Sequence, residues 1–167
     1  DRSPSRGLGD VYKRQACAGC YAVGGNYRFP NVRVPREDNR EDWRRDEWVD
    51  EMVAALEYEY QQAVNAKTYS PTHVGRFFRW FDSGDMYDIR LAEKIYQVMR
   101  RTPNVQHWLP TRMYKFKKFQ PVIILMKGLR NVSVRFSSDS ISGQFGPDHG
   151  STIYNPANNP PTNALPC

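Results

Sequence analysis

The feature that most constrains the fold is an alternation of strand-type and helix-type sequence between residues 76 and 136. Runs rich in aromatic and β-branched residues are separated by amphipathic stretches, at steps of about 27 residues. The strand-type runs are Arg76–Phe81, Val105–Leu109 and Val132–Phe136, and the helix-type stretches are Asp88–Arg101 and about Lys117–Lys127. This order is typical of parallel βα units. The sequence therefore predicts an α/β fold of parallel βα repeats, and we expect a partial TIM-barrel-like architecture.

Each predicted strand ends in polar residues. The first is followed by Asp82-Ser83-Gly84-Asp85, the second by Thr111-Arg112 and the third by Ser137-Ser138-Asp139. Because ligands of parallel α/β proteins bind at the carboxyl ends of the strands, these polar residues are the candidates for a functional site. We therefore expect the three strand ends to converge on one site.

Asp82, Asp85 and Arg112 are the candidate catalytic residues. Two carboxylates three positions apart could bind a hard cation or act as acid and base, and Gly84 between them would let a ligand approach the backbone closely. The alternative is an Asx-type turn that caps the helix beginning near Asp88. Arg112 offers a planar cation suited to a carboxylate or a phosphate, or it forms a salt bridge to Asp82 or Asp85.

Ser83, Gly84, Ser137 and Asp139 are the candidate cofactor-binding residues. Ser83 and Gly84 lie in the same loop as the two carboxylates, and Ser137 and Asp139 could bind a ribose or another polar group. The alternative for Ser137 and Asp139 is that they only form the turn that ends the third strand.

Cys17 and Cys20 are the candidate metal ligands. Their Cys-x-x-Cys spacing, followed by two glycines, is typical of a loop that binds zinc or an iron–sulfur cluster through thiolates. A third cysteine at the spacing Cys-x3-Cys-x2-Cys would fall at Lys13. The alternative is a pair of unligated thiols. Three cysteines in all do not make a disulfide scaffold, so we expect a cytoplasmic protein.

The segment before the repeat is less regular. Residues 1–15 have no hydrophobic periodicity and look like a translated sequencing adapter, so we expect a non-native tail. We expect residues 16–167 to form a single α/β domain that is incomplete at both ends. Phe29–Pro35 contains two prolines and is expected to be an extended connector. Apolar residues at helical spacing predict one long helix from Arg40 to about Ala66.

The net charge of +6 is compatible with a nucleic-acid partner, but the basic residues are scattered along the chain. The segment Tyr114–Phe119 interleaves aromatic residues with lysines and could follow a phosphate backbone. The simpler interpretation places these lysines on the outer face of an amphipathic helix. No apolar run is long enough to cross a bilayer, so we expect no membrane span.

Several segments, in the same order along the chain, resemble the phage gene product 88 family from about Ala16 to Cys167. They are Cys20-Tyr21-Ala22, Phe29-Pro30-Asn31-Val32, Arg79-Trp80-Phe81-Asp82-Ser83-Gly84-Asp85, Trp108-Leu109-Pro110-Thr111-Arg112 and Val132-Ser133-Val134-Arg135. Members of this family are similar to radical S-adenosylmethionine proteins in having a cysteine loop ahead of a βα barrel. No established reaction comes with the family.

The resemblance implies a [4Fe-4S] cluster on Cys17 and Cys20, with S-adenosylmethionine as its partner. The segment Ser83-Gly84-Asp85 stands where radical enzymes have a Gly-Gly-Glu motif that receives the methionine amino group. Arg112 would then pair with the carboxylate, and Ser137 or Asp139 with the ribose. Reductive cleavage would give a 5′-deoxyadenosyl radical that acts on an unknown small-molecule or macromolecular substrate. The alternative is a non-catalytic binding module stabilised by zinc or a cluster, with nucleic acid as a candidate partner.

Overall fold

The structure, a computed structural model, describes residues 24–66, 74–138, 145–148, 150 and 151. The chain divides into two compact units, one formed by Val34–Val134 and the other by Asp1–Arg33 together with Arg135–Cys167. The predicted tail and three of the predicted site residues, Cys17, Cys20 and Asp139, lie outside the described residues.

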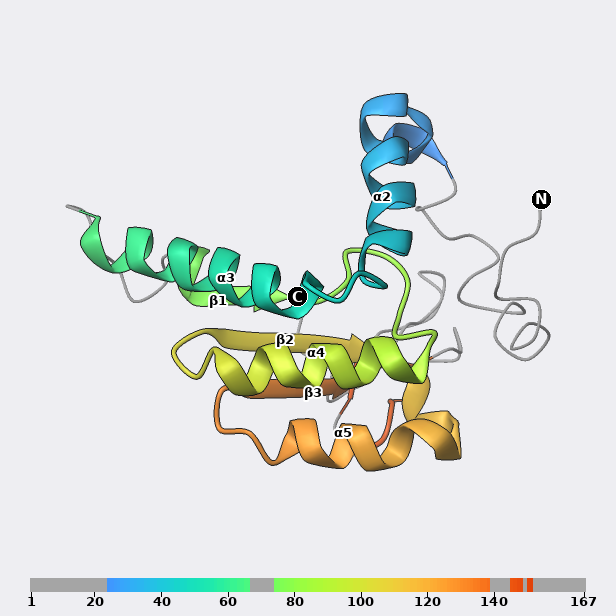
Figure 1. Ribbon diagram of the computed structural model, residues 1–167. Helices are drawn as coiled ribbons and strands as arrows, with labels where there is room; N and C mark the ends of the chain where they lie inside the picture. The colour runs from blue at the N-terminus through green and yellow to red at the C-terminus, as the bar shows by residue number, and fades with distance from the viewer. Residues whose placement is uncertain (1–23, 67–73, 139–144, 149, 152–167) are drawn as a thin grey trace, which may run out of the picture. The chain divides into compact units, whose positions relative to one another are not determined.

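A three-stranded parallel sheet is the centre of the unit Val34–Val134, with its strands in the order β1, β2, β3 (Figure 1). The strands are β1 (Phe77–Arg79), β2 (Gln106–Thr111) and β3 (Val132–Phe136). Parallel pairing of β1 with β2 places Phe78 opposite His107 and Arg79 opposite Trp108. The predicted α/β class with parallel βα repeats is confirmed, although β1 is shorter than the predicted strand.

Two helices, α4 (Ile89–Arg101) and α5 (Gln120–Lys127), connect the strands and lie on the same face of the sheet, where they contact each other (Figure 1). Their buried residues recur at helical spacing and are Leu91, Ala92, Ile95, Val98 and Met99 in α4, and Val122, Ile123 and Met126 in α5. In β2, Leu109 is buried and Trp108 is exposed, as alternation along a strand requires. One face of the sheet is therefore covered, and the described residues leave the other face open.

Helix α4 begins and ends on side chains that satisfy its free backbone groups. Asp88 is its N-cap and accepts from the N–H of Arg90 at 2.9 Å, as the capping interpretation of this segment predicts. At the other end, the amide Nδ2 of Asn131 donates to the carbonyls of Met99, Thr102 and Val105 at 3.0–3.1 Å. Asn131, which directly precedes β3, therefore joins the end of α4 to the start of two strands.

The expectation of an extended connector over Phe29–Pro35 is wrong, because helix α2 spans Pro30–Asp42. Pro30 occupies the first helical position, where a missing N–H costs nothing and the fixed φ suits a helix. The carbonyl of Phe29 accepts from the N–H groups of Val32 and Arg33 at 3.0 and 2.8 Å, which closes the first turn. Pro35 lies inside the helix, where it removes one backbone hydrogen bond without ending the helix.

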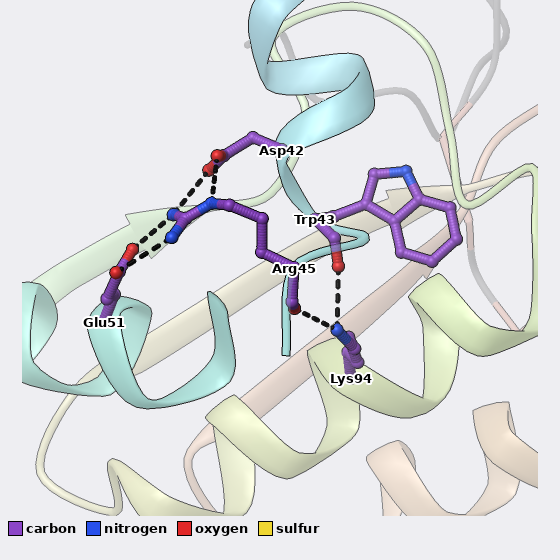
Figure 2. A network of polar contacts seen from close by, with 5 residues as sticks. All are labelled: Asp42, Trp43, Arg45, Glu51 and Lys94. Carbon is purple, nitrogen blue, oxygen red and sulfur yellow. Dashed lines mark hydrogen bonds and ion pairs between the residues drawn. The ribbon is translucent and has the colours of Figure 1, made fainter. Parts of the chain in front are cut away.

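The prediction of one helix from Arg40 to Ala66 is also wrong, because α2 ends at Asp42 and α3 spans Trp48–Asn65. The turn between them is held by side chains (Figure 2). The guanidinium of Arg45 donates to Asp42 at 2.6 Å and to Glu51 at 2.9 Å. From α4, the Lys94 ammonium donates to the carbonyls of Trp43 and Arg45 at 2.9 and 2.5 Å. Carbonyls that a continuous helix would bond internally are thus satisfied by a lysine distant in sequence.

The predicted helix from Lys117 to Lys127 begins three residues later than expected. Lys117–Phe119 forms a separate 3₁₀ turn, and α5 begins at Gln120. Pro121 lies in the first turn of α5, where it has no helical hydrogen bond to lose. The lysines of this segment are exposed and Phe119 is fully buried, but Lys115, Lys117 and Lys118 lie in 3₁₀ turns rather than on the expected amphipathic helix.

Candidate functional site

The loop after β1 and the end of β2 meet at Asp85, as predicted for the first two of the three strand ends. Its Oδ1 accepts from the Thr111 hydroxyl at 2.7 Å and from the Met86 N–H at 2.8 Å. Its Oδ2 accepts from the N–H of Arg112 at 2.7 Å. The Thr111 hydroxyl oxygen in turn accepts from the N–H of Met113 at 3.0 Å. Both carboxylate oxygens of Asp85 therefore tie the loop after β1 to the end of β2.

Two opposing effects act on the pKa of the Asp85 carboxyl. Burial raises the pKa of the Asp85 carboxyl, and the hydrogen bonds from the Arg112 N–H, the Thr111 hydroxyl and the Met86 N–H oppose this rise. All three partners donate hydrogen bonds to Asp85, so these contacts suit the ionised carboxylate, which has no proton to donate. The hydrogen bond with Arg112 is made by its main chain, and the positive charge of Arg112 also lowers the pKa of Asp85.

The loop that carries Asp82, Ser83 and Gly84 has an unusual backbone. Phe81 has φ of 59° and Gly84 has φ of 92°, both in the left-handed region. Glycine adopts this region freely, whereas Phe81 does so at a cost of about 1–3 kcal/mol. The Arg36 guanidinium of α2 donates to the Ser83 hydroxyl at 2.5 Å, and Asp82 is exposed. Ser83 thus contacts α2, while Asp85 lies where this loop meets the end of β2.

The remaining strand-end candidate, Ser137, belongs to the other unit. There it forms a parallel bridge with Ser151, and the N–H of Ser151 donates to the carbonyl of Phe136 at 2.9 Å. In the described residues, Asp85, Thr111 and Arg112 are brought together, with Ser83 and Gly84 in the same loop.

A groove on the open face of the sheet is the feature that the sequence did not reveal. It encloses about 420 Å³, and its described lining consists of Phe77, Phe78, Arg79, Gln106, His107, Trp108, Arg130, Val132 and Ser133. The guanidinium carbon of Arg79 lies 4.8 Å from the centroid of the Trp108 ring. Phe77 and Trp108 are 52% and 44% exposed. The alternation of polar and apolar residues in β2 was the available signal, but parallel strands are usually covered on both faces.

His107 forms part of the groove lining, but its imidazole is engaged below the surface. The indole Nε1–H of Trp80 donates to its Nδ1 at 3.3 Å, and its Nε2 lies 2.8 Å from the Thr102 hydroxyl, which donates to the Val98 carbonyl. These partners fit a neutral ring with its proton on Nε2. Burial lowers the pKa of His107 from 6.5 to about 4, so the ring is uncharged at neutral pH.

The sequence profile of a family described as Gene product 88 matches residues 11–155. The chain belongs to the gene product 88 family. This match confirms the family resemblance stated from the sequence motifs. No curated protein and no solved structure matches the chain.

The described part of the gene product 88 chain contains neither a cluster of metal-binding side chains nor a membrane-spanning helix. Its described side chains contain no group of three or more His, Cys, Asp or Glu residues placed to bind a metal ion. None of its described helices has the length and apolar character needed to cross a membrane. The two cysteines proposed as ligands are not among these residues, so the metal prediction rests on their spacing.

Proposed function

We propose that this gene product 88 protein is a binding protein that holds a planar, negatively charged ligand on the open face of its sheet. The observation that supports this most is the Arg79–Trp108 pair in the groove, which presents a cation and an aromatic ring side by side. Arg130 adds a second cation, and none of the nine described lining residues is acidic. A nucleotide joins a planar base to a phosphate and fits both features.

The exposed aromatic rings support the same conclusion. About half of the surface of Phe77 and of Trp108 is exposed to water, although both faces of a parallel sheet are usually covered. A ligand ring placed against them would remove apolar surface from water, which is favourable by about 25 cal/mol for each Å². Gln106 and Ser133 in the same groove supply polar atoms that could orient the ligand.

In this proposal, Asp85 has a structural role. Its two oxygens accept from the Thr111 hydroxyl and the Arg112 N–H at 2.7 Å each, so the loop after β1 is fixed to the end of β2, in the sheet whose open face binds the ligand. The binding site and the strand-end junction are then different parts of the same sheet.

Calorimetric titration of the whole chain with adenosine and uridine monophosphates tests the proposal. Trp108→Ala and Arg79→Gln should each weaken binding, because each removes one half of the recognition pair. Tyr58→Ala removes an exposed aromatic ring from α3, and Arg100→Gln removes an exposed cation from α4; both should bind as the wild type does. Wild-type chain without measurable binding, or groove variants that bind as tightly as the wild type, would refute the proposal.

A second candidate is an iron–sulfur protein of radical S-adenosylmethionine type with a partial βα barrel. The consecutive strand order with α4 and α5 on one face favours it, since barrels of βα units are arranged in this way (Figure 1). Two thiolates, Cys17 and Cys20, fit iron or zinc by their chemistry. A bound [4Fe-4S] cluster would supply the electron that cleaves S-adenosylmethionine.

The chain's own residues would then orient the cofactor. Ser83 and Gly84 would lie near the methionine amino group, Arg112 would pair with its carboxylate, and Ser137 or Asp139 would bind the ribose. Metal analysis and an absorption spectrum of protein purified without oxygen test this candidate. Iron with sulfide and a band near roughly 400 nm that is lost in Cys17→Ser, but kept in Cys167→Ser, would support it. Zinc without iron would favour a metal-stabilised binding module, and protein without any bound metal would refute the iron–sulfur candidate.

A further inference from the structure

We infer that the ligand of the open sheet face is single-stranded nucleic acid; this inference rests on the function proposed above and specifies its ligand class. Two aromatic rings carry the argument. Phe77 pairs with Gln106 and Arg79 pairs with Trp108, so Phe77 and Trp108 lie diagonally on neighbouring strands of the same face. Strands about 4.8 Å apart with a rise of about 3.3 Å per residue put the two positions about 8 Å apart. Two rings at this separation offer surfaces to two successive bases rather than to one.

The charges in the groove match a polymer of phosphates. Arg79 lies on β1, and Arg130 lies in the loop before β3, so cations stand on both sides of the central strand. Each nucleotide of a strand repeats the same two groups, a planar base and a phosphate, and both find partners here. An acidic peptide would pair with the arginines, but its carboxylates would offer no planar ring to stack on the two exposed aromatic rings.

The aromatic rings also select a single strand over a duplex. In a duplex the faces of the bases are stacked on one another, whereas single-stranded bases can stack on protein aromatic rings. A platform of exposed aromatic and cationic side chains on a sheet face is suited to unpaired bases. His107 is neutral and engaged by Trp80 and Thr102, so it adds no charge to the groove at neutral pH.

Fluorescence anisotropy with labelled oligothymidylate and oligouridylate of about 12 nucleotides tests the inference on the whole chain. Trp108→Ala should weaken binding at least about fivefold, since stacking of one base is worth about 1–3 kcal/mol. Phe77→Ala should also weaken it. Arg79→Lys keeps the charge but loses the planar cation, and should retain the salt dependence while weakening binding. Arg79→Gln should reduce the slope of log K against log salt by about 0.7.

The controls separate this inference from the broader proposal. Tyr58→Ala and Arg100→Gln should change oligonucleotide affinity less than twofold, and circular dichroism should show that every variant is folded. If mononucleotides bind through Trp108 but oligonucleotides bind no tighter, the inference fails while the proposed function stands. If neither binds, both fail. Equal binding of a duplex of the same length, or equal competition by a polyglutamate peptide, would also overturn the inference.

Discussion

Asn131 offers the sharpest test of how this fold is held together, because one amide joins three buried carbonyls. Its Nδ2 donates to Met99, Thr102 and Val105, and the Asn131 side chain is buried. Met99 would bond the N–H of residue 103 in a continuing helix, but that residue is Pro103, which has none. The Thr102 carbonyl has a second donor, the N–H of Val105 at 3.1 Å. The Met99 carbonyl therefore depends more than the Thr102 carbonyl on the hydrogen bond from Asn131.

The magnitude follows from these partners. Asn131→Ala leaves a buried carbonyl without its donor, at about 1–3 kcal/mol, and weakens the bonds to the other two. We expect a total loss of about 2–4 kcal/mol in the free energy of unfolding. Asn131→Asp has nearly the same shape but, when ionised, points only acceptors at three carbonyl oxygens, and should cost more than the alanine variant.

Urea unfolding followed by circular dichroism measures these losses. With a slope of about 2 kcal/mol per molar, Asn131→Ala should move the midpoint down by about 1–2 M. Asn104→Ala is the matched control, because this asparagine lies exposed in the loop between α4 and β2; its effect should stay within about 0.5 kcal/mol. An Asn131→Asp midpoint equal to that of the wild type at pH 7 would refute the hydrogen-bonding argument, since only packing would then matter.

Three further predictions concern other contacts of the same unit. Gly75→Ala should cost about 1–3 kcal/mol in urea unfolding, because a Cβ there would lie 2.3 Å from the Glu59 carbonyl oxygen; Gly24→Ala, with open space, should not. Asp85→Asn should cost about 1.5–3 kcal/mol, because its amide nitrogen would face a donor; an unchanged midpoint would show that the junction contributes nothing. Burial lowers the pKa of His107 from 6.5 in the unfolded chain to about 4 in the folded chain, so protonation of this residue favours unfolding. The free energy of unfolding should therefore be highest above pH 6.5 and fall by about 3 kcal/mol towards pH 4. The His107→Gln variant should not show this loss.

The sequence predicted best where the local pattern and the tertiary contacts agree. The helix α4 was expected from Asp88 to Arg101 and is observed from Ile89 to Arg101, because its apolar spacing, its N-cap and its following proline all favour one outcome. Strand β3 is observed over the expected residues. The meeting of Asp85 with Thr111 and Arg112 was also predicted, since parallel strands bring their carboxyl ends to one edge.

The predictions failed where a contact distant in sequence decides the local structure. The helix predicted from Arg40 to Ala66 runs through Asp42 and Trp48, yet the chain turns between these two residues, and carbonyls of the turn accept from Lys94 of α4. The groove was missed for a similar reason. Arg79 and Trp108 are far apart in sequence, and only the register of β1 against β2 makes them neighbours. The role of Asp85 in joining the loop after β1 to β2 depends on two donors, the Thr111 hydroxyl and the Arg112 N–H, whose directions no spacing reveals.

The two faces of the sheet carry different kinds of polar residue, and this difference supports the division of roles proposed here. His107 and Thr111 on the covered side and Asn131 before β3 are buried, and each makes hydrogen bonds within the fold. Such groups are costly to expose or to leave unpaired, so they are poor choices for binding a ligand that comes and goes. On the open side, Arg79 and Trp108 are exposed and can exchange solvent for a partner without breaking a buried hydrogen bond. Recognition is therefore expected on the open face, while the polar residues of the covered side fix the register that places Arg79 beside Trp108.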